Sequence, residues 1–250
     1  MGPQQPDLGG VVTVRVDLNA DLGESWERWR SGEDVLLLDV VTSANVCCGA
    51  YAGDAELMRE TCEAAVARGV AIGAQVGYPD RPGFGRVFVD LPVDALTDEL
   101  VRQVRLLDDI ARAAGGAVAY VKPHGALYNT IVDHEEHARA VVDALVELDR
   151  PLPLLGLPGS RVLALAAEAG LPTVLEGFAD RAYTPEGRLV PRGETGAVLD
   201  DPDDVAAQAV RLLGDVDSIC VHSDSPGALE LARAVRAALE DAGAEVVGAS

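Results

Sequence analysis

The sequence predicts a single-domain α/β fold, a (β/α) barrel of parallel strands. Apolar, β-rich runs alternate with amphipathic helical patterns about seven times along the chain, which is typical of parallel α/β folds. Most of these runs are apolar throughout, as in strands that are covered on both faces. The 250 residues, 48% of them hydrophobic, suffice for one sizeable core. We therefore assign residues 1–250 to one domain and expect residues 1–10 to form a disordered tail, with a doubly wound open sheet as the alternative architecture.

Strands are predicted where β-rich runs lie between turn signals. The first covers residues 11–16, Val-Val-Thr-Val-Arg-Val. The others cover residues 70–74, 117–121, 152–155, 173–175 and 218–221.

Helices are predicted between these strands from apolar stripes and capping residues. Asp54 can cap a helix that ends at Gly69, and a second stripe over residues 96–110 ends at Gly115. Later helices are predicted to start at Ser160, Asp201 and Ser225, the last two with proline at the first helical position.

An acidic segment, residues 17–24, directly follows the first predicted strand. It carries three carboxylates and one carboxamide, on Asp17, Asn19, Asp21 and Glu24. Strand ends in soluble folds normally carry turn residues and a single acid, so this density indicates charge that is aimed at a ligand. We interpret the segment as a turn that forms one wall of an active site.

Polar residues also follow later strands, on the carboxyl-terminal rim where parallel α/β folds bind ligands. Asn45 begins one such segment, and residues 77–86 form a glycine-rich loop that can cover a ligand. Lys122 and His124 lie two residues apart at a strand end, where they can serve as electrophile and as acid or base.

A further histidine and an arginine are candidate site residues on this rim. His222 follows an apolar strand as His124 does, whereas His134 and His137 lie at an acidic helix start and are predicted to be solvated. Arg181 can bind a carboxylate or phosphate through its guanidinium fork, or form an ion pair with Asp180 inside the chain.

The composition excludes several kinds of partner. The formal net charge is −21, and so negative a surface repels nucleic-acid phosphates and anionic lipid heads. No apolar run is long enough to cross a bilayer and the first residues lack the regions of a signal peptide, so a cytoplasmic location is predicted. Four cysteines are predicted to be small apolar fillers: Cys47, Cys48, Cys62 and Cys220.

Common nucleotide and zinc motifs are absent. The sequence contains no P-loop, no Rossmann fingerprint and no zincin motif. An ATP site would therefore be unconventional or built together with a partner.

Several blocks together resemble one protein family. They cover residues 17–24, 42–45, 69–74, 77–80, 121–129 and 178–181, and they include the long runs VDLNADLGE and VKPHGALYN. In this order, from about residue 12 to 248, they resemble the LamB/YcsF family. The resemblance implies a distorted seven-stranded barrel related to glycoside hydrolases and deacetylases. It also implies ATP-dependent opening of 5-oxo-L-proline to L-glutamate, performed together with partner subunits B and C.

The resemblance assigns roles to the rim residues. Asp21, Glu24, Lys122 and His124 would be catalytic, with Lys122 offsetting oxyanion charge. Substrate binding would fall to Asn19, Asn45, Tyr51, Gln75, Arg181, His222 and Asp224. The implied cofactor is ATP, with Mg²⁺ as a hard cation that the carboxylates and amides could hold through oxygen.

Two residues depart from the family's usual motifs. Tyr51 stands where C-G-F-H-A-G-D has histidine, and Gln75 stands where G-A-H-P-G-Y-P-D has it. Neither side chain replaces imidazole both as metal ligand and as proton shuttle, so we assign no transition metal. Two alternatives stay open: a divergent hydrolase of another amide or a carbohydrate, and a non-catalytic binding or regulatory paralogue.

Overall fold

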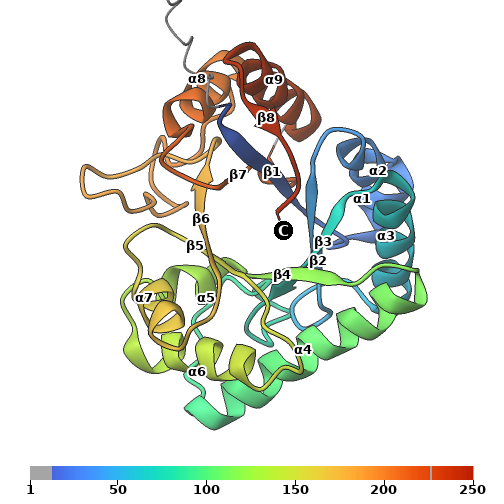
Figure 1. Cartoon of the computed structure of the whole chain (residues 1–250), viewed down its shortest axis with the longest axis vertical. Coiled ribbons are helices and arrows are strands. Elements are labelled where there is room, and N and C mark those ends of the chain that lie inside the picture. Colours follow the sequence, from blue (N-terminus) through green and yellow to red (C-terminus); the bar gives the residue numbers. More distant parts are fainter. Residues whose placement is uncertain (1–12, 226, 250) are drawn as a thin grey trace, which may run out of the picture.

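The computed structural model describes residues 13–225 and 227–249, which form a closed barrel of parallel strands (Figure 1). The seven barrel strands are β1 (Arg15–Leu22), β2 (Ser43–Cys47), β3 (Ala71–Val76), β4 (Val118–Pro123), β5 (Leu154–Gly156), β6 (Thr173–Phe178) and β7 (Ser218–Cys220). Because β1 pairs with β2 on one side and with β7 on the other, the ring closes and the predicted barrel is confirmed. A short β8 (Glu245–Val246) pairs with the start of β1.

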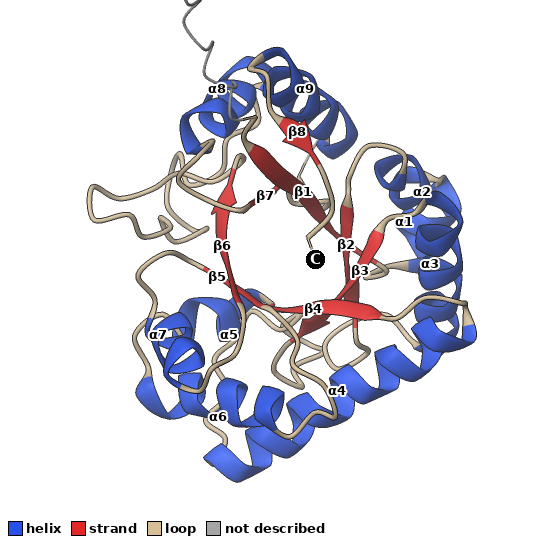
Figure 2. Cartoon of the chain, viewed as in Figure 1, coloured by secondary structure: helices blue, strands red, loops and turns tan. Residues whose placement is uncertain are grey.

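Helices surround the barrel on its outside, as Figure 2 shows. They are α1 (Trp26–Ser31), α2 (Glu33–Leu38), α3 (Ala55–Arg68), α4 (Val93–Ala113), α5 (Gly125–Thr130), α6 (Glu135–Val146), α7 (Arg161–Glu168), α8 (Pro202–Leu212) and α9 (Ala228–Asp241). As predicted, the Asp54 side chain caps α3, and α3 ends at Gly69, whose φ of 68° suits glycine. In the described part of the chain, no helix has both the length and the apolarity needed to span a membrane.

The predicted start of the last helix was wrong. Gly227 occupies the N-cap position of α9, and Pro226 lies outside the described residues. The Ser225 hydroxyl instead donates to the Asp180 carboxylate at 3.0 Å.

The first strand lies further along the chain than predicted. β1 covers Arg15–Leu22, so most of the acidic segment is strand and not turn, and residues 11 and 12 lie outside the described part. The segment forms a strand because its apolar and polar side chains alternate. Leu18, Ala20 and Leu22 join the hydrophobic core, while the polar side chains that alternate with them bond to side chains on other strands of the barrel.

The barrel interior is a polar network. Asn19 Nδ2 donates to Ser218 Oγ at 2.7 Å and to Glu176 Oε1 at 3.1 Å, and Asn45 Nδ2 donates to Asn19 Oδ1 at 2.7 Å. The Tyr120 hydroxyl donates to Asn45 Oδ1 at 2.7 Å. Its ring requires glycine at position 73, because a Cβ there would lie 2.1 Å from Tyr120. These bonds link neighbouring strands and strands two apart in the ring, beneath the carboxyl-terminal mouth of the barrel.

The segment between β6 and α8 folds back beside that mouth. Arg181 pairs with Val198, and Tyr183 pairs with Leu189, in isolated antiparallel bridges. In Figure 1 the segment projects as an orange loop next to β6. We call residues 181–198 the strap.

Candidate active site

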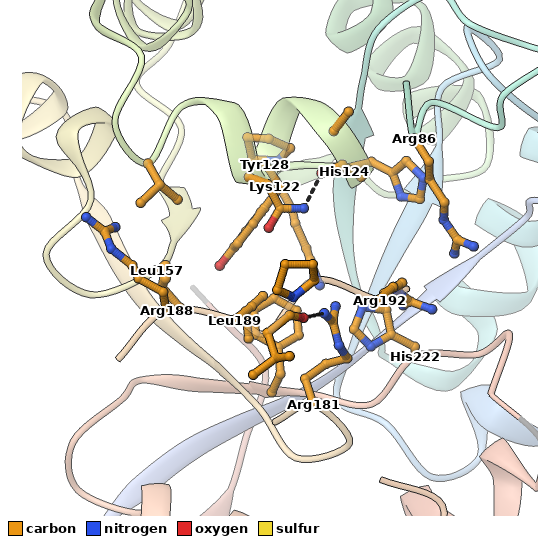
Figure 3. A pocket seen from close by; sticks show the side chains of 18 of the residues that line it. Arg86, Lys122, His124, Tyr128, Leu157, Arg181, Arg188, Leu189, Arg192 and His222 are labelled. Atoms are coloured by element: carbon orange, nitrogen blue, oxygen red, sulfur yellow. Dashed lines mark hydrogen bonds between the residues drawn. The ribbon is translucent and has the colours of Figure 1, made fainter. Parts of the chain in front are cut away.

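A cavity of about 420 Å³ lies between the carboxyl-terminal strand ends and the strap (Figure 3). Parallel β/α barrels bind their ligands at this face. Charged and aromatic side chains line much of it, among them Asp21, Arg86, Lys122, His124, Tyr128, Phe178, Arg181, Arg188, Arg192 and His222.

Lys122, the only lysine of the chain, lies at the cavity floor among acceptor groups. Its Nζ is 2.7 Å from Glu176 Oε1 and 3.4 Å from Asp21 Oδ1, and it donates to Asn19 Oδ1 at 3.0 Å. Burial by itself would lower the pKa of Lys122, but the charge of Asp21 and its other acidic neighbours hold it well above the ordinary value. Lys122 is therefore an ammonium ion at neutral pH.

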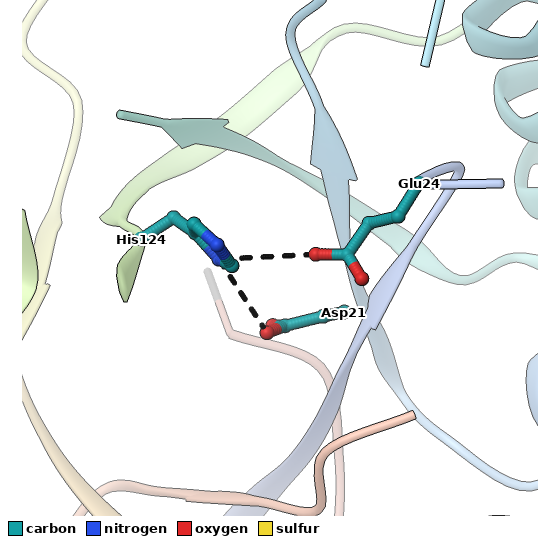
Figure 4. Close-up of side chains that lie close together, drawn as sticks. All are labelled: Asp21, Glu24 and His124. Atoms are coloured by element: carbon teal, nitrogen blue, oxygen red, sulfur yellow. Dashed lines mark ion pairs between the residues drawn. The ribbon is translucent and has the colours of Figure 1, made fainter. Parts of the chain in front are cut away.

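Asp21 and Glu24 prefer opposite protonation states although they lie close together (Figure 4). Burial favours a raised pKa for Asp21, but the charge of Lys122 outweighs it and holds the pKa well below its usual range. Burial, followed by the charge of Asp21, raises the pKa of Glu24 well above its usual value. The pair thus combines a carboxyl group that loses its proton easily with one that binds its proton more tightly than usual.

Replacing Glu24 with glutamine is expected to change how stability depends on pH. Since the folded-state pKa of Glu24 is raised, its contribution to the free energy of unfolding is complete below about pH 4.3 and is lost as pH rises toward the folded-state pKa. Glutamine mimics the protonated carboxyl. Between about pH 5 and 8, Glu24→Gln should therefore gain stability relative to the native chain, by about 1 kcal/mol or more.

Urea unfolding at several pH values measures this gain. The matched control is Glu27→Gln, which removes a carboxylate from an exposed position near Glu24. Parallel pH curves for Glu24→Gln and the native chain would show that Glu24 is ionised in the folded protein.

His124 is held as a neutral imidazole. Its ring stacks on Tyr51 with a centroid distance of 4.1 Å and an interplanar angle of 4°. Its Nδ1 lies 3.1 Å from Gln75 Nε2, which donates to it, and its Nε2 donates to the Phe84 carbonyl oxygen at 3.1 Å. Burial lowers the pKa of His124 to about 4. Both nitrogens are thus engaged, and Tyr51 and Gln75 help to position the ring.

His124 is expected not to titrate between about pH 5.5 and 8, because its pKa of about 4 lies below this range. Its imidazole resonances in NMR spectra, assigned by their loss in His124→Gln, should stay constant over this range. A titration with a midpoint near pH 6.5 would contradict the neutral, hydrogen-bonded ring.

His222 and Asp180 form a second buried pair. His222 Nδ1 donates to Asp180 Oδ1 at 2.9 Å, and the backbone N–H of His222 donates to Asp180 Oδ2 at 3.1 Å. Burial favours a raised pKa for Asp180, but the His222 imidazole lowers it below the ordinary value. His222 lines the cavity, and its Nε2 has no hydrogen-bond partner in the part of the chain that the structure describes. A carboxylate-oriented imidazole with a free Nε2 can accept or return a proton.

The arginines have different partners. Arg181 donates through Nη2 to the Val190 carbonyl at 2.6 Å and through Nε to the Ala197 carbonyl at 3.2 Å, so it ties the strap together. Asp180 pairs with His222, so the Asp180–Arg181 ion pair that the sequence left open is not formed. Asp224 instead forms ion pairs with Arg86 and, at 3.6 Å, with Arg192.

The structure brings together many of the residues that the sequence singled out. Those that line the cavity are Asp21, Lys122, His124, Arg181 and His222. Others lie around them without lining it: Asn19, Glu24, Asn45, Tyr51, Gln75 and Asp224. The latter group supports the lining side chains through hydrogen bonds, stacking or charge.

Three residues of the site were not predicted as site residues: Arg86, Glu176 and Asp180. Asp180 was considered only as a partner of Arg181, and Arg86 only as part of a glycine-rich loop. Glu176 lies at an inward position of β6, where a charged side chain in an otherwise apolar strand was the available signal.

The prediction that both other histidines are solvated was wrong for His137. His137 is buried, and its Nδ1 lies 2.5 Å from the Tyr78 hydroxyl. The four cysteines are buried as free thiols, as predicted, and burial raises the pKa of Cys47 to about 12. Such thiols are poor nucleophiles.

Asp21, Glu24 and His124 each place one potential metal-ligand atom within 4.8 Å of the others. However, the Gln75 amide already donates to Nδ1 of His124, and Lys122 supplies positive charge to Asp21. Burial and the charge of Asp21 also raise the pKa of Glu24 well above its usual value, so Glu24 gives up its proton less readily. This donor set does not fit a transition metal. That Mg²⁺ accompanies ATP stays a prediction.

Sequence comparison identifies close relatives. A model of the LamB/YcsF family matches residues 16–250. A protein of Streptomyces avermitilis that is named as the A subunit of 5-oxoprolinase is 56% identical, with 92% of this chain and 98% of that protein aligned.

Structural comparison supports the same barrel. The crystal structure of a lactam utilization protein from Thermus thermophilus is 39% identical, with a TM-score of 0.87, over 94% of this chain and all of that one. A T48 deacetylase solved with substrate has a TM-score of 0.51 at 15% identity, over 94% of this chain and 88% of that one. The latter likeness is one of fold alone, and it confirms the predicted deacetylase-like barrel.

Proposed function

The chain belongs to the LamB/YcsF family, and on this premise we propose that it is the A subunit of a 5-oxoprolinase. In this function it opens 5-oxo-L-proline to L-glutamate in an ATP-dependent reaction, together with subunits B and C. The observation that carries the proposal is the 56% identity, over nearly full length, to a protein that bears the name of this same 5-oxoprolinase component. The fold and the relatives fit a hydrolase.

The chemistry explains why ATP is needed. A lactam amide is a poor electrophile, and phosphorylation of its oxygen would make attack by water on the ring carbon easier. The γ-phosphoryl group would pass from ATP to the ring oxygen with release of ADP. Water then adds to the ring carbon, the carbon–nitrogen bond breaks and the nitrogen takes up a proton, which leaves an acyl phosphate. A second water displaces phosphate from this acyl phosphate, and glutamate results.

The charges of the cavity suit this attack. The Lys122 ammonium lies at the floor, where it would offset negative charge that develops on the ring oxygen. Asp21, whose pKa is low, is a weak base and would orient water or the ring N–H instead of removing a proton. His222, oriented by Asp180, would take the proton from water and return it to the nitrogen. His124 would position neighbouring groups, because both of its nitrogens are engaged.

We place ATP on the partner subunits. The chain has no P-loop, and its one lysine is held between two buried carboxylates instead of being free for phosphates. These residues do not fit a conventional triphosphate site. This chain would then contribute the ring-opening step.

The non-catalytic alternative predicts a site plugged by Tyr51. Tyr51 instead packs behind His124 and does not line the cavity. The open cavity with its oriented histidine favours an enzyme.

The proposal is tested by measuring glutamate formed from 5-oxo-L-proline with purified subunits B and C. Glutamate should appear only when this chain, both partners and ATP are present. No glutamate from a complex whose assembly is verified by size-exclusion chromatography would contradict the proposal. In that event, glutamate formed by the variant Tyr51→His/Gln75→His would show that the two replacements removed the activity.

A further inference from the structure

The cavity is strongly basic within an acidic protein. The chain carries a formal net charge of −21, yet Lys122 and four arginines line this one cavity. Among the described residues, only Asp21 and Asp133 line it with carboxylates. Such a concentration of positive charge indicates an anionic ligand.

Most of these cations already have partners. Lys122 lies between Asp21 and Glu176, and Arg188 Nη2 donates to Asp133 Oδ1 at 2.7 Å. The guanidinium of Arg181 donates to carbonyls of the strap.

Arg86 and Arg192 differ from these cations, because both depend on a single carboxylate oxygen. Arg86 Nη2 forms an ion pair with Asp224 Oδ2, and Arg192 Nη1 lies 3.6 Å from the same oxygen, too far for a hydrogen bond. Figure 3 shows Arg86 and Arg192 beside His222 on one side of the cavity, with Arg188 on the other. Two guanidinium groups thus converge where one carboxylate serves both.

A third arginine nearby makes it more unfavourable for two guanidinium groups to share one carboxylate. Arg181 is buried nearby, and burial followed by the charge of Arg192 lowers its pKa. Like charges at partly buried sites repel, and a bound anion would relieve the repulsion. A planar oxyanion such as a carboxylate can accept two parallel N–H hydrogen bonds from one guanidinium group. Arg192 does not form such a pair with Asp224, because the contact between them is too long.

We infer that Arg192, assisted by Arg86, binds the carboxylate of the substrate, the role that the sequence analysis gave to Arg181. This inference rests on the proposed function, since 5-oxo-L-proline carries one carboxylate on its ring. With that carboxylate on Arg192, the ring extends into the cavity toward Lys122 and His222. The arginine pair thereby selects cyclic amides that bear an acidic group.

The test compares two ligands that differ only in this group, 5-oxo-L-proline and its uncharged carboxamide. Isothermal titration calorimetry on the full chain should show that the native protein prefers the acid by about 10- to 100-fold, the value of a charged hydrogen-bonded pair. Arg192→Gln should lose this preference while its affinity for the carboxamide stays unchanged. The charge-matched control is Arg211→Gln on the exposed face of α8, and it should behave as the native chain.

The outcomes separate the inference from the proposed function. If Arg192→Gln keeps the full preference for the acid, the inference is overturned while the proposed substrate stands. If the native chain binds neither ring compound, the proposed substrate is in question, and thermal unfolding with acetate or inorganic phosphate decides the arginine site. Stabilisation of the native chain but not of Arg192→Gln would support an anion site, with phosphate over acetate indicating a phosphoryl group. If acetate and phosphate change the unfolding temperature of both proteins equally, the anion site at Arg192 is overturned.

Discussion

Replacing Lys122 with methionine is expected to lower turnover by about 10²- to 10³-fold and to destabilise the fold by about 3–5 kcal/mol. Turnover falls because the variant lacks the ammonium that offsets charge on the ring oxygen. Stability falls because Asp21 and Glu176 are left buried without the cation that both contact. Glutamate formation and urea unfolding measure the two effects, with turnover assayed below the unfolding temperature of the variant.

A double variant separates the two causes. Lys122→Met/Glu176→Gln removes one of the stranded carboxylates, so it should recover much of the lost stability but none of the turnover. The stability loss of Lys122→Met should also shrink toward about pH 4, because an unpaired Asp21 takes up a proton more readily. Equal stability of Lys122→Met and the native chain at neutral pH would contradict the buried ion-pair network.

Replacing Asp180 with asparagine is expected to lower kcat by about 10²- to 10⁴-fold while KM changes little. Asp180 accepts hydrogen bonds from His222 Nδ1 and from the Ser225 hydroxyl. An asparagine side chain would present an N–H where one of these acceptors is needed, so the His222 ring would turn or change tautomer. Because Asp180 acts through His222, the pH profile of kcat should change together with its magnitude.

The control for this substitution is Asp203→Asn, which removes an exposed carboxylate from the first turn of α8. It should leave kcat unchanged. A kcat for Asp180→Asn within threefold of the native value would mean that His222 needs no orientation for the reaction.

Local patterns in the sequence were enough to predict a parallel α/β fold, whereas the seven-stranded barrel was implied by the family resemblance. Asp54 and Gly69 marked the ends of α3, because capping and left-handed backbone are local chemistry. β1 was misplaced because its polar and apolar residues alternate, which a search for continuous apolar runs does not detect. The same alternation explains why the segment still supplies one wall of the site.

The sequence predicted which residues lie at the site better than it predicted which side chains contact them. Lys122, His222 and Asp21 were found because charged groups at strand ends are rare. Their partners Glu176 and Asp180 were missed, since each lies more than 40 residues along the chain from the side chain that it contacts. Such pairings depend on how the strands are arranged in the barrel, and no spacing within one segment encodes them.

We propose that the residues of this cavity open the ring, while ATP is used elsewhere in the complex. The most direct measurement is glutamate formation by the complex assembled with His222→Gln, with ATP hydrolysis followed in parallel. We expect glutamate formation to fall by about 10²-fold or more, while subunits B and C still assemble with the variant and still hydrolyse ATP. Glutamate formation at the native rate by the His222→Gln complex would contradict it.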